Sequence, residues 1–204
     1  AEFKNPELLI FNEKLSEEIG LGSIEDEKDL QFLNASSVPE SVKTYATAYA
    51  GHQFGNWAGQ LGDGRAILAG EIINSVGKKH EIQWKGAGAT PYSRHADGRA
   101  VLRSSVREYL MSEAMHHLGI PTTRALSLSL TGENVLRDVM YDGNPDYEKG
   151  AVMVRIAESF LRFGHFELIS AQNDVENLRK LADFSIKNYF PEINPESPEK
   201  YAAF

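Results

Sequence analysis

The sequence predicts an α+β fold with a mostly antiparallel sheet. Three observations lead to this fold class: two strand-like segments joined by a short turn over residues 66–85, a segment of helical period over residues 102–118, and a group of strand-like segments between residues 124 and 157. A chain of 204 residues is long enough for one large domain, or for one domain and part of another.

The first quarter of the chain is predicted to be helical in two places. Residues 6–20 carry apolar side chains at the spacing of a short amphipathic helix, which would end near Gly20 or Gly22. Residues 45–51 also look helical and stop at a glycine.

A β-hairpin is predicted next. Residues 66–73 are an apolar run, residues 74–77 have the composition of a turn, and residues 80–85 alternate in polarity. Alternation along the second strand places its side chains on two faces of the sheet: Ile82 and Trp84 on one, and Glu81, Gln83 and Lys85 on the other.

The remaining elements are a helix, further strands and a second helix. Residues 102–118 are predicted to be helical, with an apolar stripe formed by Leu102, Val106, Leu110, Ala114 and Leu118. The later elements are expected at 124–131 and 134–140 (a strand pair with its turn at 131–133), 150–157 (a strand), 174–189 (a helix) and 201–204 (the start of another helix).

Composition excludes several kinds of protein. Cysteine is absent, so disulfides and thiolate metal sites are excluded within these residues. No run of eighteen apolar residues is present, and the net charge of −8 argues against a general nucleic-acid binder. Residues 85–107 nevertheless carry five basic side chains and one acidic one, which suits a small polyanion. A solvated face with internal ion pairs is the alternative explanation.

The order of chemical groups along the chain is that of a protein-kinase small lobe. Residues 51–65 contain five glycines, Lys85 follows on a strand, and Glu108 follows on a helix. In such a lobe the loop covers phosphates, and the carboxylate holds the lysine in place. The alternatives are a structural turn for the loop, a solvated Lys85, and Glu113 in place of Glu108 as the partner of the lysine.

Several blocks of the chain resemble the selenoprotein O family over about residues 45–190. They are Gly51–Gly55 (GHQFG), Gln60–Ala66 (QLGDGRA), Lys85–Gly88 (KGAG), Thr90–Arg94 (TPYSR), Asp97–Ser105 (DGRAVLRSS), Glu113–His116 (EAMH), Gly119–Leu126 (GIPTTRAL) and Ser159–Glu167 (SFLRFGHFE). The resemblance implies a protein-kinase-like fold that binds ATP in a flipped orientation and, with Mg²⁺ (or Mn²⁺ as an alternative), transfers AMP to Ser, Thr or Tyr hydroxyls of proteins.

The resemblance also implies roles for individual residues. Lys85 and Glu108 form the catalytic ion pair, and the ATP ligands are Gly62, Gly64, Arg65, Lys85, Asp97, Gly98, Arg155 and Arg162. Arginine suits the phosphate role because its planar fork forms paired hydrogen bonds with phosphate oxygens. The general base and the metal ligands of the family are not found here and are expected beyond Phe204.

The domain organisation expected from this resemblance has three parts: an N-terminal extension (1–44), a nucleotide-binding small lobe (45–157), and a hinge with the beginning of a truncated second lobe (158–204). The piece alone is expected to be inactive and to self-associate through the face that the second lobe would cover. Expected partners are ATP and protein substrates, without nucleic acid or membrane. The expected location is cytoplasmic in a bacterium and mitochondrial in a eukaryote.

Two other functions remain open at this point. One is a non-catalytic pseudokinase that uses ATP as a scaffold or sensor. The other is a protein-interaction domain in which the glycines only form turns.

Overall fold

The structure of the chain, a computed structural model, describes residues 3–204. These residues divide into two units, each described here by itself. The first unit contains the residues up to Ala46 together with Asp63–Ala157. The second contains Thr47–Gly62 and Glu158–Phe204.

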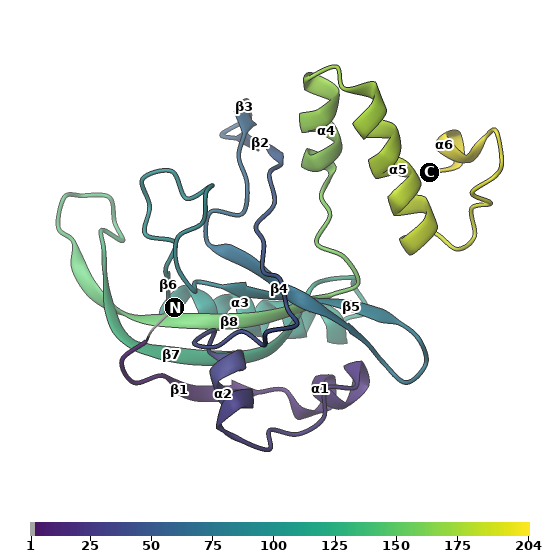
Figure 1. Cartoon of the computed structure of the whole chain (residues 1–204). Helices are drawn as coiled ribbons and strands as arrows, with labels where there is room; N and C mark the ends of the chain where they lie inside the picture. Colours follow the sequence, from purple (N-terminus) through teal and green to yellow (C-terminus); the bar gives the residue numbers. More distant parts are fainter. Residues whose placement is uncertain (1–2) are drawn as a thin grey trace. The chain divides into compact units, whose positions relative to one another are not determined.

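An antiparallel sheet organises the first unit (Figure 1). Its strands are β1 (Glu7–Phe11), β4 (Ala66–Ile73), β5 (Lys79–Lys85), β6 (Ala100–Val101), β7 (Arg124–Arg137) and β8 (Asp146–Ala157). The order is β1-β7-β8-β5-β4, and β6 pairs with β8. Every strand pair of this sheet is antiparallel. The α+β class with a mostly antiparallel sheet is therefore confirmed, and so is the hairpin of β4 and β5.

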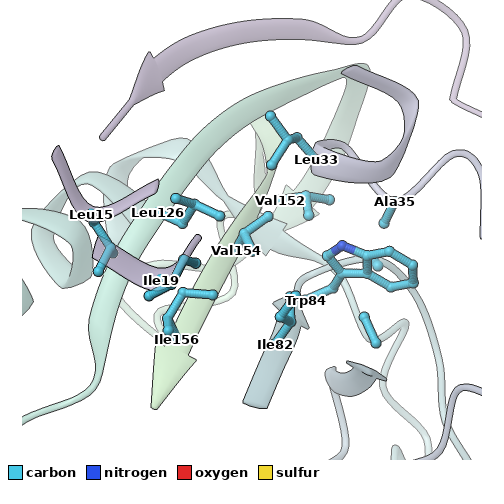
Figure 2. Packing of buried hydrophobic residues seen from close by; sticks show 12 residues of the cluster. Leu15, Ile19, Leu33, Ala35, Ile82, Trp84, Leu126, Val152, Val154 and Ile156 are labelled. Atoms are coloured by element: carbon cyan, nitrogen blue, oxygen red, sulfur yellow. The ribbon is translucent and has the colours of Figure 1, made fainter. Parts of the chain in front are cut away.

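Helices α1 (Glu13–Ile19) and α2 (Glu27–Leu33) pack on one face of this sheet. Leu15, Ile19 and Leu33 from these helices meet Trp84 and Val154 from the strands in one buried cluster, which Figure 2 shows. The predicted position of Ile82 and Trp84 on a shared face is confirmed, because both belong to this cluster.

The opposite face of the sheet carries α3 (Leu102–His117). Tyr109 of this helix packs with Leu128 and Met153, and Met153 lies between Val152 and Val154 of the first cluster on strand β8. Residues on this face, including those of the candidate site, are thus separated from α1 and α2 by the thickness of the sheet.

The buried face of α3 differs from the predicted one. Its buried residues are Ser105, Tyr109 and Ser112. Of the predicted stripe, Leu102 and Val106 pack against the core, whereas Leu110 and Leu118 are 59% and 73% exposed and Ala114 is also exposed. The prediction failed for the C-terminal half because the helix turns Ser105, Tyr109 and Ser112 toward the sheet in place of the apolar stripe.

Two predicted helices differ from the structure. Residues 6–20 were predicted as one helix, but Glu7–Phe11 form strand β1 and pair with β7, and only the short helix α1, capped by the Asn12 side chain, follows. The predicted end of this helix at Gly20 is confirmed, because Gly20 is its C-cap. Residues 45–51 are extended: Tyr45 bridges Leu68, and Ala50 begins strand β2. Backbone pairing available only in the folded chain replaced the local helical preference in both places.

Residues 124–140 were predicted as a strand pair, but residues 124–137 are one strand, β7. The expected turn is instead an irregularity in the pairing with β8, between Leu130 and Asn134. Gly132 lies there with φ +73°, and a Cβ on it would come within 2.6 Å of the Asn5 carbonyl oxygen. The turn-forming residues therefore produce a bulge that accommodates a neighbouring segment.

The second unit contains a small hairpin and three helices within its described residues. The hairpin consists of β2 (Ala50–Gln53) and β3 (Asn56–Gln60), and the helices are α4 (Phe163–Ala171), α5 (Val175–Tyr189) and α6 (Lys200–Ala203). Gly164 approaches the Ala50 carbonyl so closely that a Cβ would lie 2.1 Å from its oxygen. The predicted helix at 174–189 is confirmed, as is a helical turn close to the C-terminal residues. Over residues 3–204, none of the helices has the length and apolar character needed to span a bilayer.

Candidate functional site

Lys85, Glu108 and Arg155 form a charged cluster in the first unit, on the α3 face of the sheet. Lys85 Nζ donates a hydrogen bond to Glu108 Oε2, and Arg155 Nη1 donates to Glu108 Oε1 at 3.0 Å. The side chains of the three residues are 20%, 28% and 10% exposed, respectively. The ion pair predicted between Lys85 and Glu108 is therefore present, and Arg155 shares the same carboxylate.

The strand register brings these groups together. Lys85 is the last residue of β5, and Arg155 lies on β8 directly opposite Gln83. Glu108 lies on α3, which crosses the same face. Gln83 is fully buried, and its Oε1 accepts a hydrogen bond from Arg155 Nη2. The Arg155 guanidinium is thus held from two sides, by a carboxylate and by a neutral amide.

The positive charge of this cluster exceeds its negative charge. Burial lowers the pKa of Lys85 below its usual value of 10.5, the charges of Arg155 and Arg65 lower it further, and Glu108 only partly opposes them. Burial acts to raise the pKa of Glu108, but Lys85 and Arg155 outweigh it, so this pKa lies below 4.5. One carboxylate is shared by two close cations, with a third nearby, and an added anion would be attracted to them.

The end of the glycine-rich loop lies beside Lys85. Ala66 pairs with Lys85 in the hairpin register, and the Gly86 amide donates to the Arg65 carbonyl oxygen at 2.8 Å. Gly64 belongs to the same unit and accepts a hydrogen bond from the Ser93 hydroxyl. A Cβ on Gly64 would lie 3.0 Å from the Tyr92 carbonyl oxygen.

Asp97 and Gly98 lie in the loop before β6. Both carboxylate oxygens of Asp97 accept hydrogen bonds from Arg137 at 2.8 Å, and these hydrogen bonds hold the pKa of Asp97 below its usual value. Gly98 has φ +67°, and a Cβ on it would lie 2.1 Å from the Gly88 carbonyl oxygen. Glycine is required there because two backbone segments almost touch.

Glu113 is not the partner of Lys85. Its carboxylate accepts hydrogen bonds from Arg124 Nε at 3.0 Å, from Arg124 Nη2 at 2.9 Å and from Asn12 Nδ2 at 2.9 Å. The Ala125 amide donates to it as well, at 2.9 Å. Glu113 ties α3 to β7 and to the start of α1, which is a structural role, and the alternative assignment of the lysine partner is resolved in favour of Glu108.

Arg162 and Gly62 belong to the second unit. The Arg162 guanidinium lies over the ring of Tyr49, 5.0 Å from its centroid. The Arg162 amide donates to His165 Nδ1 at 2.9 Å, at the start of α4. These contacts describe Arg162 within its own unit, and its nucleotide role stays a prediction.

Two residues of the site were not singled out from the sequence. Gln83 was placed on the face of Lys85 but given no role, and Arg137 was not considered. The alternation of β5 was a usable signal for Gln83, because a residue two positions before Lys85 must share its face. Nothing in the local sequence links Arg137 to Asp97.

Among residues 3–204, no group of three or more His, Cys, Asp or Glu side chains could hold a metal ion. The described part of the chain therefore supplies no metal centre that we can assign.

A lysine and an arginine that share one carboxylate, with Arg65 and Gly64 beside the lysine, form a site that attracts a small anion. Residues 1–204 match the family described as protein adenylyltransferase SelO. The chain belongs to this family, which confirms the resemblance read from its motifs.

The chain is similar to proteins named protein nucleotidyltransferase YdiU. It is 53% identical to the one from Flavobacterium johnsoniae over 98% of its length, and 54% identical to the one from Nitrosospira multiformis, also over 98%. Identity to the protein of Azoarcus sp. is 61% over 80% of the chain. The matched regions make up 38%, 36% and 31% of these three relatives, so the chain spans less than two fifths of their length.

Proposed function

We propose that this chain is the nucleotide-binding part of an ATP-dependent protein adenylyltransferase with a protein-kinase-like fold. The full-length protein would transfer AMP to Ser, Thr or Tyr hydroxyls of protein substrates. The single observation that carries the proposal is the cluster in which Lys85 and Arg155 share the Glu108 carboxylate, with Arg65 close enough to lower the pKa of Lys85.

In this proposal the cluster binds the phosphates of ATP. Glu108 holds Lys85 and Arg155 in place, and their surplus positive charge neutralises phosphate oxygens. The end of the glycine-rich loop, with Gly64 and Arg65, lies beside Lys85 and would contact the same ligand. Asp97, Gly98, Gly62 and Arg162 are proposed as further nucleotide ligands on the family resemblance alone.

The proposed reaction is an attack of an acceptor hydroxyl oxygen on the α-phosphorus. A new bond forms between that oxygen and the α-phosphorus, the bond to the bridging oxygen of the β-phosphate breaks, and pyrophosphate leaves. The hydroxyl proton passes to a general base that we place outside this chain. Fixed cations that face the β- and γ-phosphates would stabilise the charge that develops on the leaving pyrophosphate.

Magnesium enters the proposal as an ion that neutralises phosphate charge. Residues 3–204 offer no group of three acidic or imidazole ligands to hold it. We assign no metal ligand here and derive no step through the ion.

The test uses ATP labelled at either the α- or the γ-phosphate, incubated with full-length protein, magnesium and a protein acceptor. Label transferred from the α-position only is the expected result. Transfer from the γ-position only would make the protein a conventional kinase. Tight ATP binding with no transfer of either label would favour the pseudokinase, and an absence of binding would favour the interaction domain.

A further inference from the structure

The hydrogen bond between Gln83 and Arg155 is a part of the cluster that the proposed function does not yet use. Gln83 lies directly opposite Arg155 in the β5–β8 register and is 0% exposed, while Arg155 is 8% exposed. Arg155 Nη2 donates to Gln83 Oε1, and Arg155 Nη1 donates to Glu108. The guanidinium plane is therefore fixed by two acceptors on different elements.

The orientation of the Gln83 amide follows from chemistry. A guanidinium only donates hydrogen bonds, so the amide oxygen must face Arg155 and the amide nitrogen must point away. That nitrogen is buried and has no hydrogen-bond partner among the described residues. An unsatisfied buried donor is unfavourable, and a methionine would fill similar space without it. The contribution of this glutamine therefore lies in its bond to Arg155.

The neutrality of Gln83 is the second part of the argument. A carboxylate at this position would also hold Arg155, but it would add a second negative charge to a cluster whose surplus is positive. A neutral acceptor orients the guanidinium and leaves its charge available to a ligand.

We infer that Gln83 is a positioning residue that aligns Arg155 for binding a polyphosphate group, through a hydrogen bond that does not neutralise the arginine. This inference rests on the proposed nucleotide function and adds to it a determinant of phosphate affinity. The class of ligand is the triphosphate portion of a nucleotide or a free inorganic polyphosphate.

The test measures binding of inorganic tripolyphosphate to the full-length protein by titration calorimetry. Gln83→Met keeps the volume and removes the acceptor, and we expect its affinity to fall by about tenfold, the loss of one charge-assisted hydrogen bond. Gln83→Glu keeps the acceptor and adds charge. Its affinity for tripolyphosphate should fall more than that of Gln83→Met at low and at high salt, because position 83 is fully buried and salt screens a buried charge only weakly.

The matched control is Ser127→Val. Ser127 is buried in the same sheet and pairs with Val154, but it lies on the face of the first core cluster. The affinity of the Ser127→Val variant for tripolyphosphate should equal that of the wild type. Thermal unfolding of every variant checks the fold. A larger loss in Gln83→Glu, which keeps the acceptor, than in Gln83→Met, with unfolding temperatures like that of the wild type, is a signature of the added charge that the loss of a contact would not produce.

The outcomes separate the two proposals. If the wild type binds neither tripolyphosphate nor ATP, the nucleotide function is refuted and the role of Gln83 with it. If it binds ATP alone, the same variants are compared with ATP as the ligand. If the wild type binds and both Gln83 variants bind equally well at all salt concentrations, only the role of Gln83 is refuted. If Gln83→Met does not fold, unchanged affinity of Gln83→Glu at low salt refutes the inference by itself.

Discussion

Replacing Glu108 by glutamine would test whether this carboxylate organises the cluster. The substitution keeps the size of the side chain but removes the charge that Lys85 and Arg155 share. All three side chains are largely but not completely buried, at 20%, 28% and 10% exposure for Lys85, Glu108 and Arg155. A fully buried pair loses about 3–5 kcal/mol when one partner is removed. For this partly exposed cluster we expect a loss of about 1–3 kcal/mol.

The expected loss corresponds to a fall in melting temperature of roughly 2–12 °C, at about 2–4 °C per kcal/mol for a chain of this size. Thermal unfolding followed by circular dichroism at neutral pH measures it. The matched control is Glu71→Gln. Glu71 pairs with Lys79 at 3.0 Å on the neighbouring strands, but the side chains are 50% and 25% exposed, so about 0–1 kcal/mol is expected.

The pH dependence gives a second measurement on the same variant. The pKa of Glu108 is lower in the folded protein than its usual value of 4.5, because Lys85 and Arg155 outweigh burial. Its contribution to stability is therefore present above pH 4.5 and is lost as the pH falls through the lowered pKa. The difference between wild type and Glu108→Gln should shrink in acid. A variant as stable as the wild type at neutral pH, or a difference that grows in acid, would refute this reasoning.

Three further predictions concern the same unit. Lys85→Ala in the full-length protein should lower ATP affinity at least about tenfold, whereas Lys79→Ala on the same strand should leave it unchanged. If Lys85→Ala binds ATP as tightly as the wild type in a calorimetric titration, Lys85 is not part of the site. Affinity for tripolyphosphate should fall as the pH rises through the lowered pKa of Lys85, below 10.5, and the Lys85→Ala variant should lack this titration. Gly98→Ala should destabilise the fold by about 1–3 kcal/mol more than Gly77→Ala in chemical unfolding. Both glycines have positive φ, but only a Cβ at Gly98 would collide with the Gly88 backbone. Equal losses of unfolding free energy in the two variants would contradict this account.

The candidate site was predictable where its residues follow one another in a characteristic order. A glycine-rich stretch, a strand lysine and a helix glutamate predicted that Lys85 pairs with a carboxylate of the following helix. The family resemblance pointed to Glu108, and the structure has this pair. The choice between Glu108 and Glu113 could not be made from spacing alone. It depends on the rotation of α3 against the sheet, which turns Glu113 toward Arg124 and Asn12.

The sequence by itself determined the family, the α+β class and the elements whose pattern is strong over many residues, such as the β4–β5 hairpin and the helices α3 and α5. These features depend on the local preference of residues for helix or strand and on the spacing of polar and apolar residues, and both can be read from neighbouring positions in the sequence. Only the tertiary structure decided that residues 7–11 are an edge strand, that residues 124–137 are one bulged strand, and that Gln83 lies against Arg155. The reason is that strand pairing and register join residues far apart in sequence, and their energy is gained only when the partner strand is present.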